Sequence, residues 1–153
     1  MNMADGPAAR EASIGYLVHW GGRLLRRLAD RRLKPLGLSS AHLPVINALA
    51  DARPLSQKAL AEIAAIEQPT MAAMLARMER DRIVERRPDP NDKRSSLFSL
   101  TPATRKKIPA LRRAVEQVND DALRGLPADQ RRQFRAQLEI MIRAMDKLAG
   151  DPS

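Results

Sequence analysis

Residues 68–80 carry side chains whose types and spacing could read the edges of DNA bases. Gln68 can pair with adenine and Arg77 with guanine, while Thr70 and Ala73 can touch a thymine methyl group. Apolar residues repeat every third or fourth position and would form the buried stripe of the same helix, namely Met71, Met74, Leu75 and Met78. Taken alone, such a segment is more often an ordinary amphipathic helix with a solvated polar face.

A second group of charged side chains makes the DNA interpretation stronger. Residues 89–92 read Asp-Pro-Asn-Asp, which is strong turn chemistry, and Lys93 and Arg94 follow directly. An extended arm with these residues at its tip can reach a minor groove, where the negative potential attracts arginine. We expect Asp92 to orient the guanidinium of Arg94.

Local signals predict the elements that must position these two groups. Ser56 can cap a helix, with Leu55 and Leu60 spaced as its hydrophobic staple. Pro69 suits the first turn of a second helix, where its missing N–H is not needed. Strand-like runs at 83–87 and 97–100 then predict a hairpin. The result is the outline of a winged helix-turn-helix, with Ser56 and Lys58 expected near phosphates.

The chain also resembles the MarR family of bacterial transcriptional regulators over nearly its whole length. The specific part is the wing, which runs from Asp81 to Arg94 and continues with Leu97 and Leu100-Thr101. Further similarities are Gly37-Leu38-Ser39 before an apolar helix, and Leu55-Ser56-Gln57 with Leu60-Ala61. The sequence departs from the family at Arg82, where the family often has Gly, and it lacks Cys, which excludes the thiol-sensing branch.

The composition bounds the classes of partner and of chemistry. Lys and Arg total 27 against 18 acidic residues in 153, so the net charge of +9 favours nucleic acid, with an anionic membrane second. No apolar run approaches the ~20 residues of a membrane span, and no signal-peptide pattern opens the chain, so we expect a cytoplasmic protein. His19 and His42 lie outside any nucleophile motif, and we interpret both as half-buried packing residues. We therefore expect no enzyme, metal site or cofactor.

The expected fold is mainly α with a small antiparallel β wing. The predicted organisation is a flexible tail at 1–12, an N-terminal dimerisation helix at 13–36, a DNA-binding winged helix-turn-helix at 37–101, C-terminal dimerisation helices at 102–148 and a tail at 149–153. Apolar seams in the terminal helices could pack as an antiparallel pair within one chain or against a second subunit. The resemblance implies a homodimer built from both chain ends.

Together these features predict a transcriptional regulator, of repressor type, that binds double-stranded DNA at a palindromic operator. The alternatives are a nonspecific architectural DNA-binding protein and a winged helix that contacts only proteins. The operator, the regulated genes and the choice between repression and activation are open.

The resemblance further implies release by a small aromatic or anionic effector. The candidate ligand residues are His19, Trp20 and Arg23 in the first helix, together with Arg77 and Arg86 at positions near which the family places anionic ligands. The other interpretation, held equally, is that Trp20 belongs to the interface core and the arginines serve DNA.

Overall fold

The computed structural model describes residues 13–51 and 53–150. The predicted tail at 1–12 lies outside the described residues, as do residues 151–153 of the predicted tail 149–153, whereas Ala149 and Gly150 end the last helix. The chain divides into two compact units, one up to Glu116 and one from Gln117, and each is described by itself.

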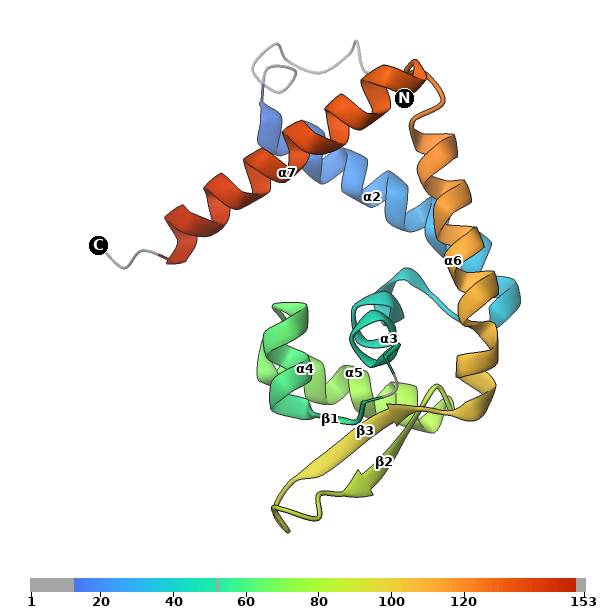
Figure 1. Ribbon diagram of the computed structural model, residues 1–153, viewed down its shortest axis with the longest axis vertical. Helices are drawn as coiled ribbons and strands as arrows, with labels where there is room; N and C mark the ends of the chain where they lie inside the picture. Colours follow the sequence, from blue (N-terminus) through green and yellow to red (C-terminus); the bar gives the residue numbers. More distant parts are fainter. Residues whose placement is uncertain (1–12, 52, 151–153) are drawn as a thin grey trace. The chain divides into compact units, whose positions relative to one another are not determined.

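The first unit contains the helix-turn-helix and the wing, which lie side by side around α3 (Figure 1). Its elements in chain order are α2 (Ile14–Leu33), η2 (Lys34–Leu36), η3 (Ser40–His42), α3 (Leu43–Leu49), β1 (Leu55–Ser56), α4 (Gln57–Ala64), α5 (Gln68–Arg80), β2 (Val84–Pro88), β3 (Ser96–Leu100) and the larger part of α6 (Pro102–Ala122).

Glycine ends the turn that follows α2. Gly37 has a φ of +70°, a conformation that costs little without a Cβ atom. Its N–H bonds to the Lys34 carbonyl at 2.9 Å, and the next N–H, that of Leu38, bonds to the Leu33 carbonyl at 3.2 Å. These bonds satisfy free carbonyls at the helix end and redirect the chain toward α3.

The wing is part of a three-stranded antiparallel sheet with the order β1-β3-β2. The predicted hairpin is confirmed, with Val84 opposite Leu100 and Pro88 opposite Ser96. The additional strand β1 was not predicted, because Leu55 and Ser56 were interpreted only as staple and cap. Leu55 lies opposite Phe98 and is buried, so it belongs to the sheet and to the core.

The core of the first unit forms where α5 packs inward. Met71, Leu75 and Met78 are 0%, 1% and 0% exposed, which confirms the predicted stripe, while Met74 is half-buried. The other fully buried side chains of this core lie on α2, α3, α4, β2 and β3, namely Leu33, Val45, Ile46, Leu49, Leu60, Val84 and Leu100. This packing fixes which face of α5 remains at the surface.

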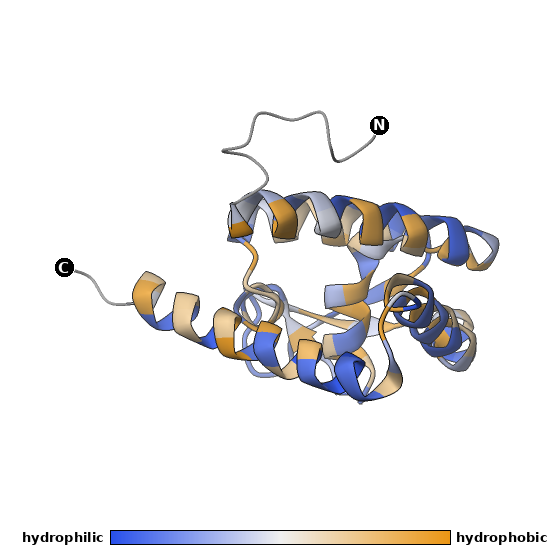
Figure 2. Ribbon diagram, turned by 90° about the horizontal axis from the view of Figure 1, so that it is seen from above, coloured by the Kyte–Doolittle hydropathy of each residue, from blue (hydrophilic) through white to orange (hydrophobic). Residues whose placement is uncertain are grey.

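The second unit consists of the end of α6 and the helix α7 (Ala128–Gly150). No residue of α7 is buried, although hydrophobic residues recur along the helix, as the orange segments of its ribbon show (Figure 2). Its exposed large apolar residues are Phe134, Ile140, Ile142, Met145 and Leu148. Helix α2 of the first unit carries a comparable exposed set, Ile14, Tyr16, Leu17, Val18, Leu24 and Leu25.

Within residues 13–51 and 53–150, no helix has the length and apolarity needed to cross a bilayer.

Candidate nucleic-acid interface

The outer face of α5 presents the polar side chains that the sequence suggested. Gln68, Thr70, Ala73 and Arg77 are all exposed, because the methionine stripe occupies the opposite face. The preceding helix α4 ends at Ala64, and the next residue, Ala65, has a φ of +50° in the turn between the helices. The arrangement therefore displays a helix face with amide, hydroxyl, methyl and guanidinium groups toward solvent.

Helix α4 approaches this face through its first turn. The Ser56 hydroxyl accepts a hydrogen bond from the Ala59 N–H at 3.2 Å, which confirms the predicted cap. Gln57 then donates from Nε2 to Oε1 of Gln68 at 3.2 Å. Lys58 is exposed beside them. Gln57 is not among the predicted site residues, because no local signal in the sequence pairs the first residues of two successive helices.

The wing carries its exposed basic residues on an ordered turn. The Asp89 carboxylate accepts from the Asn91 N–H at 2.8 Å, and the Asp89 N–H bonds to the Ser95 carbonyl at 3.1 Å. Asp92 accepts from the backbone N–H of Arg94 at 2.9 Å. The sequence predicts a contact between Asp92 and the Arg94 guanidinium, whereas the observed bond shapes the backbone that carries Arg94. Lys93 and Arg94 are exposed at this tip.

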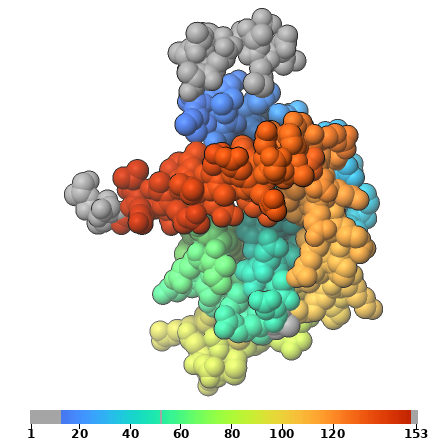
Figure 3. Space-filling view, turned by 45° about the horizontal axis from the view of Figure 1, so that its top comes forward, coloured from blue at the N-terminus to red at the C-terminus, as the bar shows by residue number. Residues whose placement is uncertain are grey.

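The helix-turn-helix and the wing border one groove of about 560 Å³. Figure 3 shows the wing emerging beside the green helices. The groove is lined from α4, α5, β2, the wing tip and β3, by residues that include Ser56, Gln57, Lys58, Gln68, Arg86, Asp92 and Arg94. The tertiary structure thus brings together the predicted phosphate residues, one predicted base-reading residue and the wing arginine.

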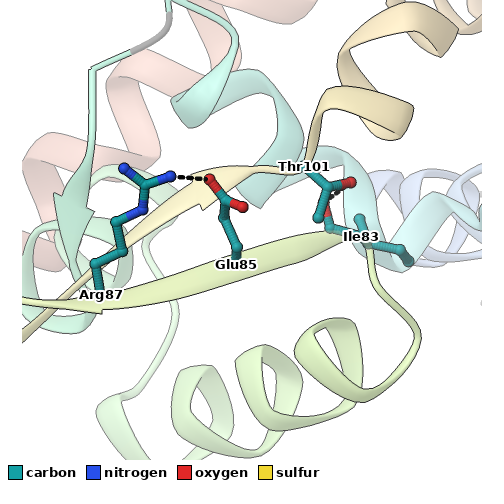
Figure 4. A network of polar contacts seen from close by, with 4 residues as sticks. All are labelled: Ile83, Glu85, Arg87 and Thr101. Atoms are coloured by element: carbon teal, nitrogen blue, oxygen red, sulfur yellow. Dashed lines mark hydrogen bonds and ion pairs between the residues drawn. The ribbon is translucent and has the colours of Figure 1, made fainter.

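The base of the wing is tied to the start of α6. Thr101 donates from its hydroxyl to the Arg82 carbonyl at 2.9 Å, with a longer contact to the Ile83 carbonyl at 3.4 Å. Glu85 and Arg87 form an ion pair of 3.1 Å on β2 (Figure 4). Arg82 has a φ of +57°, so the position where the family often has Gly does adopt the conformation that favours glycine.

The proposed ligand residues fall into separate contacts. The Arg23 guanidinium lies 5.6 Å from the ring centroid of Trp20, which is half-buried on α2. Arg86 Nε lies 3.3 Å from Glu79 Oε1, so this arginine already has a carboxylate partner. Arg77 is exposed on α5. These contacts leave the effector prediction without a single preformed site.

The histidines differ from each other in the structure. His42 is half-buried, as predicted, and its Nδ1 accepts from the Ser39 N–H at 3.1 Å. Burial lowers the pKa of His42 below its usual 6.5, with Arg77 lowering it further and Asp81 and Asp30 opposing the shift. His19 is exposed in this chain, so its interpretation as a half-buried residue was wrong. Among the residues that the structure describes, no group of three or more His, Asp or Glu side chains could hold a metal ion.

Comparisons with known proteins agree with this architecture. Residues 36–95 match a family model described as the MarR family. A MarR transcriptional regulator from Methanosarcina mazei Go1 has the same fold, with a TM-score of 0.79 and 23% identity over 88% of this chain and 97% of that one. A mutant MarR from E. coli complexed with operator DNA gives a TM-score of 0.77 and 25% identity over 92% of this chain and 99% of that one.

A third structure, the S. aureus MepR–DNA complex, has a TM-score of 0.75 and 21% identity over 87% of this chain and 98% of that one. The family match covers the helix-turn-helix and most of the wing, which are the segments that form the groove described above. The helix-turn-helix and the wing of this chain, within residues 36–95, therefore match the MarR family, whose members are winged helix-turn-helix transcriptional regulators and not enzymes.

Proposed function

We propose that this protein is a homodimeric repressor that binds a palindromic operator. The observation that carries the proposal is the groove in which the start of α5 and the arginine-tipped wing face the same space. A recognition helix reads only a few base pairs, so a two-fold dimer would read two half-sites about one helical turn apart.

Each part of the groove takes a role that follows from its chemistry. Gln68, Thr70, Ala73 and Arg77 would enter the major groove, where amide and guanidinium groups can form bidentate pairs with bases. Arg94 would enter the minor groove, with Asp92 holding its backbone and Lys93 beside it. Ser56 and Lys58 would contact phosphates. The E. coli and S. aureus relatives solved with DNA support this assignment.

The dimer is proposed from the uncovered apolar surfaces. Side chains such as Leu17 on α2 and Phe134 on α7 are 45% and 41% exposed in the single chain. Each Å² of apolar surface that is buried contributes about 25 cal/mol of favourable free energy. A second subunit could bury the apolar surfaces of both helices. We therefore assign 13–36 and 102–148 to dimerisation and 37–101 to DNA binding. Sedimentation equilibrium should give twice the mass of the 153-residue chain.

An effector would act by competing for charge within this arrangement. A small aromatic acid bound to Arg77 or Arg86 would compete with DNA for the same positive charge. Bound there or at the Trp20–Arg23 pair, it could also change the spacing of the two DNA-reading helices, provided that it binds the two arrangements with different affinity. A cytoplasmic location is part of the same proposal, because the DNA target requires it.

Selection of bound sequences from a random DNA pool tests the central proposal. A repressor should enrich a palindrome and prefer it over random DNA by a factor of about 10³ or more. Equal affinity for both would instead support the architectural alternative. Absence of DNA binding at low salt would point to a winged helix that contacts proteins. Repeating the selection with aromatic acids present tests the effector.

A further inference from the structure

We propose that Gln57 is a positioning residue that sets the base preference of Gln68, an inference that rests on the proposed role of α5 in DNA reading. The observation is the hydrogen bond from Gln57 Nε2 to Gln68 Oε1, which joins the first residue of α4 to the first residue of α5. Gln57 itself was not among the residues expected to read bases.

The backbones that carry both side chains are held in place. Ser56 caps α4 directly before Gln57, and Leu55 anchors the same point to the sheet opposite Phe98. Gln68 precedes Pro69, whose ring fixes its own φ in the first turn of α5. Side-chain hydrogen bonds are specific when the groups that form them are already fixed, because less conformational freedom is lost.

The hydrogen bond determines how the Gln68 amide is turned. A glutamine side chain has a carbonyl oxygen with two lone pairs and an NH₂ group with two donors. Gln57 donates to the oxygen, so the Gln68 NH₂ remains available together with one lone pair. In the major groove, the N6–H₂ donor of adenine lies between two acceptors, N7 of adenine and O4 of thymine. A Gln68 amide that rotates freely could exchange the positions of its donor and acceptor, and it would then match A·T and T·A almost equally. The contact with Gln57 should remove that ambiguity.

The solvent exposure of Gln57 and Gln68 suits this role. Gln57 is half-buried and Gln68 is exposed, and both line the groove that the helix-turn-helix shares with the wing. A single partly exposed hydrogen bond between neutral groups contributes little to the stability of the fold. Its loss should therefore leave the fold intact and should be visible chiefly in the choice of base.

The test is sequence selection from a random DNA pool with the full-length wild type and with Gln57→Ala, Gln68→Ala and the double variant. Gln57→Ala should reduce the preference at one base pair per half-site by about 5- to 150-fold. Preferences at the other positions and affinity for random DNA should stay within about twofold of wild type, the scatter expected for an uncoupled change. The double variant should match Gln68→Ala at that base pair, because both substitutions remove the same oriented amide.

Gln57→Glu provides a second prediction that a merely structural role would not produce. A carboxylate cannot donate to Gln68 Oε1 and can only accept from Nε2, so the amide should turn its oxygen toward the groove. The selected base at that position should then change to one that offers a donor, such as cytosine through N4. Lys58→Ala is the matched control on the same turn of α4, and it should weaken all sequences alike and reduce the salt slope by about 1 per contact.

The outcomes separate the inference from the function on which it rests. If wild type selects a palindrome and Gln57→Ala selects the same one with unchanged preferences, Gln57 has no positioning role. A Gln57→Ala variant that loses affinity for all sequences alike would also overturn the inference, because that is the behaviour of a phosphate contact. If wild type selects no sequence at all, the proposed function fails first and the inference fails with it.

Discussion

Glu79 on α5 and Arg86 on β2 form an ion pair, with 3.3 Å between Glu79 Oε1 and Arg86 Nε. The contact joins α5 to the wing. The side chains are 36% and 54% exposed, so solvent screens the pair and limits its contribution to stability to about 0–1 kcal/mol. Its main consequence is that Arg86 is directed toward Glu79 in the absence of any other anion.

Replacing Glu79 should therefore change anion binding more than stability. We expect Glu79→Gln to lower the free energy of unfolding by less than about 1 kcal/mol. The freed Arg86 should bind benzoic acids more tightly, and Glu79→Gln/Arg86→Gln should abolish the gain. Calorimetric titration with a panel of such acids measures both effects. Unchanged affinity in Glu79→Gln would show that Arg86 is not an effector residue. Glu85→Gln, which breaks the pair within β2, is the control.

Removing the wing arginine should weaken operator binding without unfolding the chain. Arg94 is exposed at the tip of the wing. The hydrogen bond from its backbone N–H to Asp92 does not depend on the arginine side chain, so it is retained in Arg94→Ala. A hydrogen bond of a charged group contributes at least about 1.5 kcal/mol. Because the proposed dimer has two wings, Arg94→Ala should lower the affinity for the operator roughly a hundredfold. A gel-shift series with matched circular dichroism checks this. Arg143→Ala on α7 removes the same charge outside the proposed interface, and equal losses in both variants would contradict the wing assignment.

Relieving the strained position before the wing should stabilise the protein. Arg82 has a φ of +57°, which costs an L residue about 1–2 kcal/mol, while glycine loses about 0.5–1 kcal/mol more chain entropy than alanine on folding. The balance predicts that Arg82→Gly raises the free energy of unfolding by roughly 0.5–1 kcal/mol. Denaturant unfolding at one protein concentration measures it. Arg82→Ala removes the charge and keeps the strain, so a gain of similar size there would contradict this explanation.

Acid should destabilise the protein through His42. Burial lowers the pKa of His42 in the folded state below 6.5, so the unfolded chain binds the extra proton first. The contribution of neutral His42 to the free energy of unfolding is present above pH 6.5. It is lost as the pH falls through the lower pKa that His42 has in the folded state. His42→Asn keeps an acceptor for the Ser39 N–H and removes the titration. The variant should lose less stability than wild type between about pH 7.5 and 5.5 in parallel denaturant titrations. Parallel curves for the two proteins would refute the assignment.

Several features of the site followed from residues close together in the sequence. The methionine stripe predicted which face of α5 is buried, because apolar side chains with helical spacing must share one face. The Ser56 cap and the turn at 89–92 depend on groups within a few residues of each other, so their chemistry can be read locally. The net charge of +9 likewise indicated a polyanion without any knowledge of the fold.

Other features required the tertiary structure, because they join residues that only folding brings together. The pairing of Leu55 with Phe98, the bond between Gln57 and Gln68 and the ion pair of Glu79 with Arg86 have no signature in any short window. The sequence by itself determined the helices, the hairpin and the DNA-reading character of this chain, since these depend on periodicity, turn chemistry and charge. Only the tertiary structure decided how side chains such as Gln68 and Arg86 are oriented, since their orientation depends on contacts between elements that form only when the chain folds.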